Sequence, residues 1–340
     1  MWYNLIMITE EIKKNDEGQR LDRYLKKAYK KASLSYIYKL IRKDLKVNGK
    51  REKEEYLLKE GDVLAFYISE EDRNSLMTDN NRKIETIKKQ FQIVFENEEV
   101  LIVNKPFGLL THGNGKEKKN TLANQVITYL IATGDYVPRN EKTFTPAPSN
   151  RLDRNTTGLV IFGKSARSCR LINEAIRERK NIRKFYLTIV KGELKEKTTF
   201  ENWMIKDELK NKVSVFDLGE KMEGEGKRII TKVTPIASKN GYSLIEVEIP
   251  TGRSHQIRSQ LQKNGFPLIG DSKYGDTLLN KKIEKEYKIN TQLLHAYKLN
   301  FDKRLVDELK LDRAEQKCLP REIFFEVCEK MDLEIGKESY

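Results

Sequence analysis

One stretch of this 340-residue chain, from Ser69 to Lys89, is polar and charged and contains few apolar residues. A stretch of this composition buries too little apolar surface to form a core of its own. We therefore expect a linker at residues 69–90. It would separate a small N-terminal domain at residues 13–68 from a larger C-terminal domain at residues 91–335, and both lengths are usual for domains.

The expected N-terminal domain is strongly basic. Between Lys13 and Glu60 the chain has 16 basic and 8 acidic residues, whereas the whole chain carries a formal net charge of +14. Apolar residues recur at helical spacing in residues 20–31 and 34–43, and Asn48-Gly49 predicts a turn between two short strands. A soluble chain this basic usually binds a polyanion. The alternative is a basic protein whose charge serves only solubility.

The expected C-terminal domain is rich in strands. Short apolar or alternating segments predict strands at residues 91–95, 100–103, 158–162, 185–190, 229–236, 242–249 and 293–301. Helical spacing predicts helices at residues 122–131, 166–179 and 254–263. Strands outnumber helices, and the helices are inserted between them. This order predicts an α+β fold with a mostly antiparallel mixed sheet flanked by helices.

Several classes of protein are disfavoured by what the sequence lacks. The three cysteines form no CxxC pair and only three histidines are present, so we expect neither a disulfide framework nor a metal site. The glycine-lysine clusters at residues 113–116 and 224–227 lack the spacing of a nucleotide-binding loop. No apolar run is long enough to span a membrane, and residues 1–8 do not resemble a signal peptide. We expect a cytoplasmic monomer that uses no cofactor.

Asp153 is the first candidate for chemistry, because Arg151 and Arg154 flank it in a turn that precedes an apolar strand. Nearby positive charge favours the ionised form of a carboxyl group. An ionised and positioned carboxylate is able to act as a nucleophile. From charge and spacing alone, a solvated turn with a local ion pair is the alternative.

A second candidate is the segment from Thr251 to Arg258. Gly252 permits a tight turn, and Ser254 is a candidate N-cap for the helix that follows. A helix N-terminus with basic and polar residues suits recognition of a phosphate or a carboxylate. A capped surface helix is the alternative for this segment. Tyr186 is a third candidate, and taken alone it also fits an ordinary aromatic residue of a strand.

Four ordered segments resemble motifs of the RluA-type pseudouridine synthases. NRLDRNTTGLVIFGKS at residues 150–165 resembles the active-site motif H-R-L-D-x-x-T-S-G-L. The other matches are VLIVNKPFGLLTHGN at 100–114, RKFYLTIVKG at 183–192, and PTGRSHQIRSQL at 250–261 with GFPLIGDSKYG at 265–275. The opening at Thr111-His112-Gly113 and the long segment after Gly275 look most like members that act on large-subunit ribosomal RNA. The sequence departs from the motif at Asn150 and Thr157, where the family has His and Ser.

The N-terminal segment is similar to an S4-type RNA-binding domain. The matching pieces are residues 20–23, the helix start at 33–41, and Val47-Asn48-Gly49. Leu34 stands where such domains often carry Arg, and nearby basic residues could supply the positive charge of that missing arginine. The order of S4-type domain, linker and catalytic domain is that of the family.

These resemblances imply an isomerase that converts uridine in RNA, most of all 23S ribosomal RNA, to pseudouridine. The reaction breaks the N1–C1′ bond, rotates the uracil and rejoins it through C5, without a metal or other cofactor. Asp153 matches the essential aspartate, Arg258 its arginine partner, and Tyr186 the tyrosine that stacks on the base. Arg151 matches the residue that helps to hold the flipped nucleotide. Further RNA-binding candidates are Lys105, Arg253, His255, Gln256, Arg20, Arg23, Lys39, Arg42 and Lys43.

Three alternatives remain. The same chemistry could act on tRNA, or the protein could bind RNA without catalysis. An RNA methyltransferase with an S4-type domain is disfavoured by the missing glycine loop.

Overall fold

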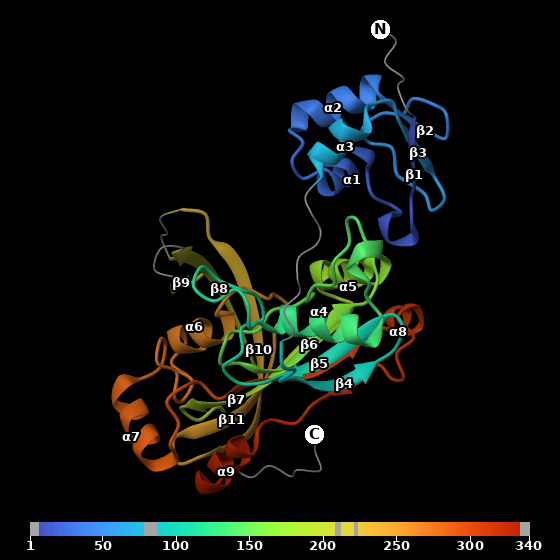
Figure 1. Ribbon diagram of the computed structural model, residues 1–340. Coiled ribbons are helices and arrows are strands. Elements are labelled where there is room, and N and C mark those ends of the chain that lie inside the picture. The colour runs from blue at the N-terminus through green and yellow to red at the C-terminus, as the bar shows by residue number, and fades with distance from the viewer. Residues whose placement is uncertain (1–6, 78–86, 208–211, 221–223, 334–340) are drawn as a thin grey trace. The chain divides into compact units, whose positions relative to one another are not determined.

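The computed structural model describes residues 7–77, 87–207, 212–220 and 224–333 (Figure 1). These residues form two compact units. The first contains the chain up to Ile87 together with Ile127–Pro146 and Lys164–Arg167. The second contains Lys88–Val126, Ala147–Gly163 and the chain from Ser168 onward.

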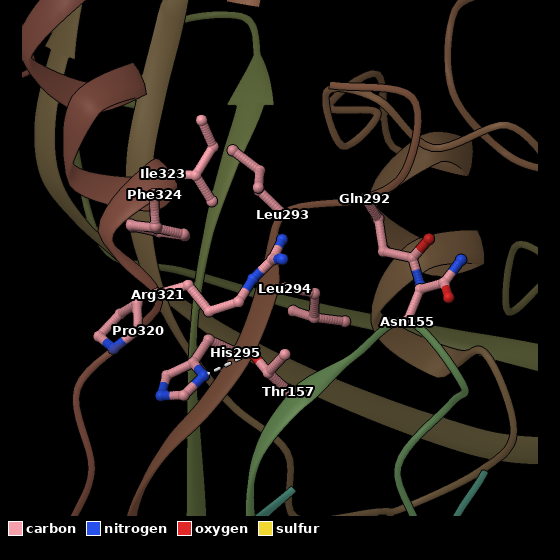
Figure 2. Close-up of a pocket in the computed structure, with 10 residues that line it drawn as sticks. All are labelled: Asn155, Thr157, Gln292, Leu293, Leu294, His295, Pro320, Arg321, Ile323 and Phe324. Carbon is pink, nitrogen blue, oxygen red and sulfur yellow. Dashed lines mark hydrogen bonds between the residues drawn. The ribbon is translucent and has the colours of Figure 1, made fainter. Parts of the chain in front are cut away.

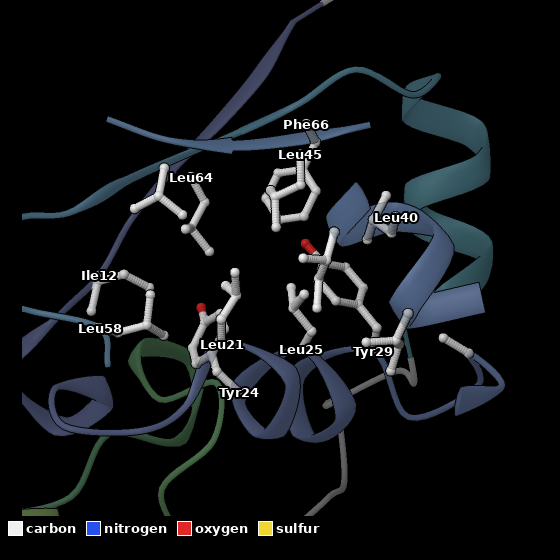
Figure 3. Close-up of a cluster of buried hydrophobic side chains, with 14 of the residues drawn as sticks. Ile12, Leu21, Tyr24, Leu25, Tyr29, Leu40, Leu45, Leu58, Leu64 and Phe66 are labelled. Atoms are coloured by element: carbon white, nitrogen blue, oxygen red, sulfur yellow. The ribbon is translucent and has the colours of Figure 1, made fainter. Parts of the chain in front are cut away.

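The first unit has a small three-stranded antiparallel sheet in the order β1-β3-β2. Its elements are β1 (Ile8–Glu11), the 3-10 helix η1 (Lys14–Asp16), α1 (Leu21–Ala28), α2 (Leu34–Lys43), β2 (Leu45–Val47), β3 (Val63–Phe66), α3 (Glu70–Leu76) and the 3-10 helix η2 (Pro138–Asn140). Asn48 and Gly49 both have positive φ, 49° and 79°, as the turn predicted between the strands requires. The apolar faces of α1 and α2 pack against the sheet in one buried cluster (Figure 3).

Helix α3 lies within the stretch expected to be a linker. Ser69 caps this helix by accepting a hydrogen bond from the Asp72 backbone N–H. Arg73 forms a 2.7 Å ion pair with the buried Glu10 of β1, and Leu76 packs against the core of the first unit. Residues 70–76 are therefore part of this unit, because an ion pair and apolar contacts tie the polar helix to it. Residues 78–86 of the expected linker, and 334–335 of the expected C-terminal domain, lie outside the described residues.

The second unit is built on a ten-stranded sheet in the order β4-β5-β6-β12-β7-β11-β10-β8-β9, with β13 paired to β12. Its strands are β4 (Gln92–Glu96), β5 (Val100–Lys105), β6 (Thr157–Gly163), β7 (Ile182–Lys191), β8 (Thr198–Asp207), β9 (Lys212–Phe216), β10 (Lys227–Lys239), β11 (Tyr242–Glu248), β12 (Leu294–Phe301) and β13 (Glu315–Lys317). Among the named strands of the described chain, only β6 and β12 pair in parallel. The predicted mostly antiparallel sheet is therefore confirmed.

Gly158 allows the parallel pairing of β6 with β12. Its φ is 116°, and a Cβ at this position would lie 2.2 Å from the carbonyl oxygen of Ala296 on β12. Any other residue would clash with the neighbouring backbone. This close approach of the two backbones explains why glycine follows Thr157 in the matched motif.

Helices lie on both faces of the sheet, as predicted. They are α5 (Ala166–Glu178), α6 (Gln256–Lys263), α7 (Thr277–Tyr287), α8 (Lys303–Glu308) and α9 (Glu322–Lys330), while α4 (Leu122–Thr133) begins in this unit and ends in the first. Ile172 of α5 packs in one buried cluster with Ile161 of β6. Phe324 of α9 packs in another with Leu187 of β7. None of the helices in the described ranges has the length and apolar character needed to cross a bilayer.

Candidate active site

The turn that carries Asp153 is held on both sides by buried side chains. The Thr111 hydroxyl donates to the Leu152 carbonyl at 2.9 Å and accepts from the Leu152 N–H at 3.1 Å. The Lys105 ammonium donates to the Arg154 carbonyl at 2.9 Å. Asp153 therefore projects from a backbone fixed at the residue before it and the residue after it. Its side chain keeps 27% of its surface exposed, which leaves the carboxylate accessible to a substrate.

Lys105 is not an RNA contact, and this corrects the expectation from the sequence. Its side chain is fully buried, and its ammonium also donates to the carbonyls of Pro106 and Leu109 at 3.1 and 2.7 Å. Burial lowers the pKa of Lys105 to about 7, although the negative charge of Asp153 opposes the shift. The structure gives Lys105 the role of holding the Asp153 turn.

Arg258 of α6 joins two carboxylates. Its Nε and Nη2 donate to Asp271 at 2.7 and 2.9 Å, and its Nη1 donates to Asp153 at 2.9 Å. Asp271 is almost fully buried. Burial alone would raise the pKa of Asp271, but the Arg258 hydrogen bonds and two backbone N–H groups outweigh it and lower that pKa. The two-pronged pair with Asp271 fixes the guanidinium plane, so that its remaining edge faces Asp153.

Asp271 was missed as a site residue from the sequence. It lies in the segment GFPLIGDSKYG, which carried the resemblance but was given no role. Its carboxylate also accepts hydrogen bonds from the backbone N–H groups of Lys273 and Tyr274 at 2.9 and 3.0 Å. The available signal was a lone acidic residue that follows an arginine-containing helix within one matched block.

His255 and Tyr274 form a second pair beside Asp153. The Tyr274 hydroxyl accepts from the Val213 N–H at 3.1 Å and lies 2.9 Å from His255 Nδ1. The hydroxyl accepts one hydrogen bond and keeps its own proton to donate; a hydrogen bond from it to Nδ1 would place the imidazole proton on Nε2. Nε2 lies 4.0 Å from the Asp153 carboxylate. Burial lowers the pKa of His255, which favours the neutral ring beside the carboxylate.

The expected N-cap at Ser254 is wrong. Helix α6 begins at Gln256, and the residue before it, His255, adopts the left-handed conformation with φ 56° and makes no side-chain cap. Gln256 is buried, and its amide bonds to Thr251 Oγ1, the Ile230 carbonyl and the Arg253 N–H. These internal bonds close the loop from inside, so Gln256 is structural and does not contact RNA.

Tyr186 lies on the central strand β7 and is 6% exposed. Burial and the negative charge of Asp153 both raise the pKa of its hydroxyl, so the phenol stays protonated at neutral pH. Within the described ranges the hydroxyl has no hydrogen-bond partner. The structure thus places a neutral aromatic ring in the electrostatic reach of Asp153.

The two departures from the matched motif both have structural partners. Asn150 donates to the Leu159 carbonyl at 3.0 Å and accepts from the Ile161 N–H at 2.9 Å, so it pairs with β6 as a strand would. Figure 2 shows Thr157 against His295, with 2.7 Å between Thr157 Oγ1 and His295 Nδ1. The other ring nitrogen of His295 lies 3.0 Å from the Cys318 carbonyl. Both departures therefore keep side-chain hydrogen bonds that hold the start of β6.

The remaining basic candidates differ in their partners. Arg151 and Arg253 are exposed, and in the described part of the chain neither has a carboxylate partner. In the first unit Arg20 forms an ion pair with Asp22 at 2.9 Å, which neutralises its charge locally. The other four candidates, Arg23 of α1 and Lys39, Arg42 and Lys43 of α2, are exposed. In the described ranges no cluster of three or more His, Cys, Asp or Glu is arranged to hold a metal ion.

The fold and this site define a class of RNA-modifying enzyme. A family model described as RNA pseudouridylate synthase matches residues 99–263. The chain is 31% identical over 295 residues to ribosomal large subunit pseudouridine synthase C of Haemophilus influenzae, with 86% of each chain covered. It is also 31% identical over 299 residues to the protein of that name from Buchnera aphidicola subsp. Baizongia pistaciae, with 85% of this chain and 88% of the relative covered.

A solved structure shares the fold. Human RNA pseudouridylate synthase domain containing 4 has a TM-score of 0.56 and 19% identity, and the match covers 72% of this chain and 94% of that chain. The chain belongs to the RNA pseudouridine synthase family. It is an isomerase that converts uridine in RNA to pseudouridine.

Proposed function

We propose that this enzyme modifies uridines of 23S ribosomal RNA, and that Asp153 is its nucleophile. The RNA target rests on the two relatives described above, which are both named for the large ribosomal subunit and align along most of both chains. The net charge of +14 fits a substrate that is a large polyanion. We further propose that the enzyme works in the cytoplasm as a monomer.

The observation that carries the assignment of the nucleophile is the 2.9 Å ion pair between Arg258 and Asp153. The Arg258 guanidinium is held in place by the buried Asp271, so Arg258 keeps a fixed position beside the Asp153 carboxylate. The reaction breaks the N1–C1′ bond and forms a C5–C1′ bond, while a proton leaves C5 and another joins N1. Asp153 would attack C1′ or C6 or assist formation of a glycal, and Arg258 would keep the carboxylate in place.

The side chains around Asp153 receive supporting roles in this proposal. Tyr186 stacks on the uracil, and its hydroxyl assists removal of the C5 proton only as it passes its own proton to another base. Arg151 holds the phosphate of the flipped nucleotide, because the target base must leave its stack to reach the carboxylate. Arg253 contacts the RNA backbone, and the His255 Nε2–H donates to the substrate.

We also propose that residues 13–68, extended by α3 (Glu70–Leu76), form an S4-type RNA-binding domain, and that the catalytic domain lies within residues 91–335. Arg23 of α1 and Lys39, Arg42 and Lys43 of α2 are exposed and have no carboxylate partner in the described residues. Contacts of this type supply affinity for folded RNA, whereas the catalytic domain selects the uridine.

One experiment tests the substrate. Pseudouridines are mapped in ribosomal RNA and tRNA from cells with the gene, without it, and with a gene that encodes Asp153→Asn. The proposal expects one or more 23S positions to lose pseudouridine in both altered strains. Loss confined to tRNA would support the alternative substrate instead.

A further inference from the structure

Lys184 is a buried cation that the reaction scheme does not use. Lys184 is 8% exposed and lies on β7, two positions before Tyr186. Side chains two positions apart on a strand point to the same face, about 6.7 Å apart. Lys184 therefore stands next to Tyr186 on the face of the sheet that bears the catalytic site.

The Lys184 ammonium also lies against the loop that leads into α6. Nζ is 3.4 Å from the place where a Cβ on Gly252 would be. Arg253, the next residue in that loop, is exposed. Burial lowers the pKa of Lys184, and the positive charge of Arg179 adds to this shift. Lys184 thus lies against the loop that carries Arg253 and within electrostatic range of the exposed Arg179.

None of the carboxylates in the described residues pairs with these three cations. In the described ranges Arg179, Lys184 and Arg253 have no ion-pair partner and Lys184 Nζ has no hydrogen-bond acceptor. The opposite face of the same strand differs, because Arg183 forms a two-pronged pair with Glu248 at 3.0 and 2.9 Å. A buried ammonium without a partner is costly. Such a group is expected where a ligand supplies the missing negative charge.

We propose that Lys184 binds a backbone phosphate of the RNA substrate, at or next to the target uridine, with Arg179 and Arg253 at the rim of this site. Tyr186 and Asp153 mark the place of the uracil and the ribose, so the strand must pass the Lys184 ammonium. The inference rests on the RNA pseudouridine synthase activity but does not depend on which RNA is modified.

The test compares Lys184→Met with Arg183→Gln. Each variant removes one positive charge from β7, but only Lys184 faces the site. Binding is measured at several salt concentrations on an RNA that the wild-type enzyme modifies. For Lys184→Met we expect about tenfold weaker binding and a log K against log salt slope that is shallower by about 0.7. The thermal midpoint should stay equal or rise, because an unpaired buried charge is removed.

A second arm leaves the protein unchanged. Single methylphosphonates replace the phosphates around the target uridine one at a time, and binding to the wild-type enzyme is measured. One position should weaken binding to the wild-type enzyme and have no further effect on Lys184→Met. The proposal is overturned if Lys184→Met binds with the wild-type affinity and salt slope, or if no methylphosphonate weakens wild-type binding. Because the RNA is chosen by wild-type activity, an error in the proposed 23S target does not affect this result.

Discussion

Arg258 donates a 2.9 Å hydrogen bond to Asp153 from the one edge of its guanidinium that Asp271 leaves free. The two aspartates differ sharply in exposure, since 27% of the Asp153 side chain and 1% of the Asp271 side chain are accessible. One carboxylate therefore anchors the arginine, and the other is presented to the substrate. This division explains why an arginine is needed, because a single ammonium cannot serve both geometries.

Asp153→Asn should abolish isomerisation while the protein stays folded. Amide and carboxylate have the same shape, but the amide carries no charge and is not a nucleophile. By analogy with other lost nucleophiles, turnover should fall by roughly 10⁴-fold or more. Pseudouridine formation is measured under single-turnover conditions, with RNA binding and circular dichroism as controls. Near wild-type turnover would remove Asp153 from the proposed mechanism.

Arg258→Lys should impair both activity and stability despite its equal charge. The lysine ammonium is a single, compact donor group. It cannot keep the two-pronged bond to Asp271 and also reach Asp153. We expect turnover to fall at least 100-fold, or about 2.7 kcal/mol in activation free energy. The unfolding free energy should also fall, because Asp271 stays buried with fewer partners. An active Lys variant with normal stability would place Arg258 on the RNA backbone instead.

Lys105→Met should destabilise the protein by about 2–4 kcal/mol, since the carbonyls of Pro106, Leu109 and Arg154 lose their donor. The measurement is denaturant-induced unfolding, together with the salt dependence of RNA binding. The salt slope should not change, because the ammonium does not reach the surface. Lys116→Met removes an exposed lysine from the same connection and serves as the control, with little expected loss of stability. A stable Lys105→Met variant with a shallower salt slope would instead support the view that Lys105 contacts RNA.

His295 should make the fold sensitive to acid. Burial lowers its pKa from 6.5 to about 4, so between these values the unfolded chain binds one more proton than the folded chain. The unfolding free energy therefore falls as the pH drops through this window, by about 1.4 kcal/mol per pH unit for this group. His295→Gln should lose this part of the pH dependence. Unfolding curves at pH 7, 5.5 and 4.5 compare the two proteins, and parallel pH dependences would contradict the assignment.

Neutralising Lys39, Arg42 and Lys43 together should weaken RNA binding. If all three contact single-stranded phosphates, the salt slope should become shallower by about 2. Turnover at saturating RNA should stay unchanged, because none of these residues lies near Asp153 in the chain. A matched control replaces the exposed Lys281, Lys282 and Lys285 of α7 with glutamine. If the two triple variants weaken RNA binding equally, the α2 residues contribute only through the overall positive charge of the protein and not through specific contacts.

The sequence by itself determined the strand-rich α+β class, the basic N-terminal helices and the family. Apolar periodicity and turn residues are local signals, and α2 was expected with the bounds that the structure has, Leu34–Lys43. The four ordered motifs also singled out Asp153 and Arg258, although 105 positions separate them. Their mechanistic roles remain predictions, but their contact in space agrees with the pairing that the resemblance implies.

Only the tertiary structure decided which polar residues face the substrate and which hold the protein together. Lys105 and Gln256 look like RNA ligands in the sequence, yet both are buried and bonded to the backbone. Asp271 has no distinguishing mark until the fold brings its carboxylate to Arg258. The physical reason is that charge and hydrogen-bonding capacity belong to a residue, whereas burial and partners come from chain segments far apart in the sequence. The function of a lysine or an aspartate depends on those partners.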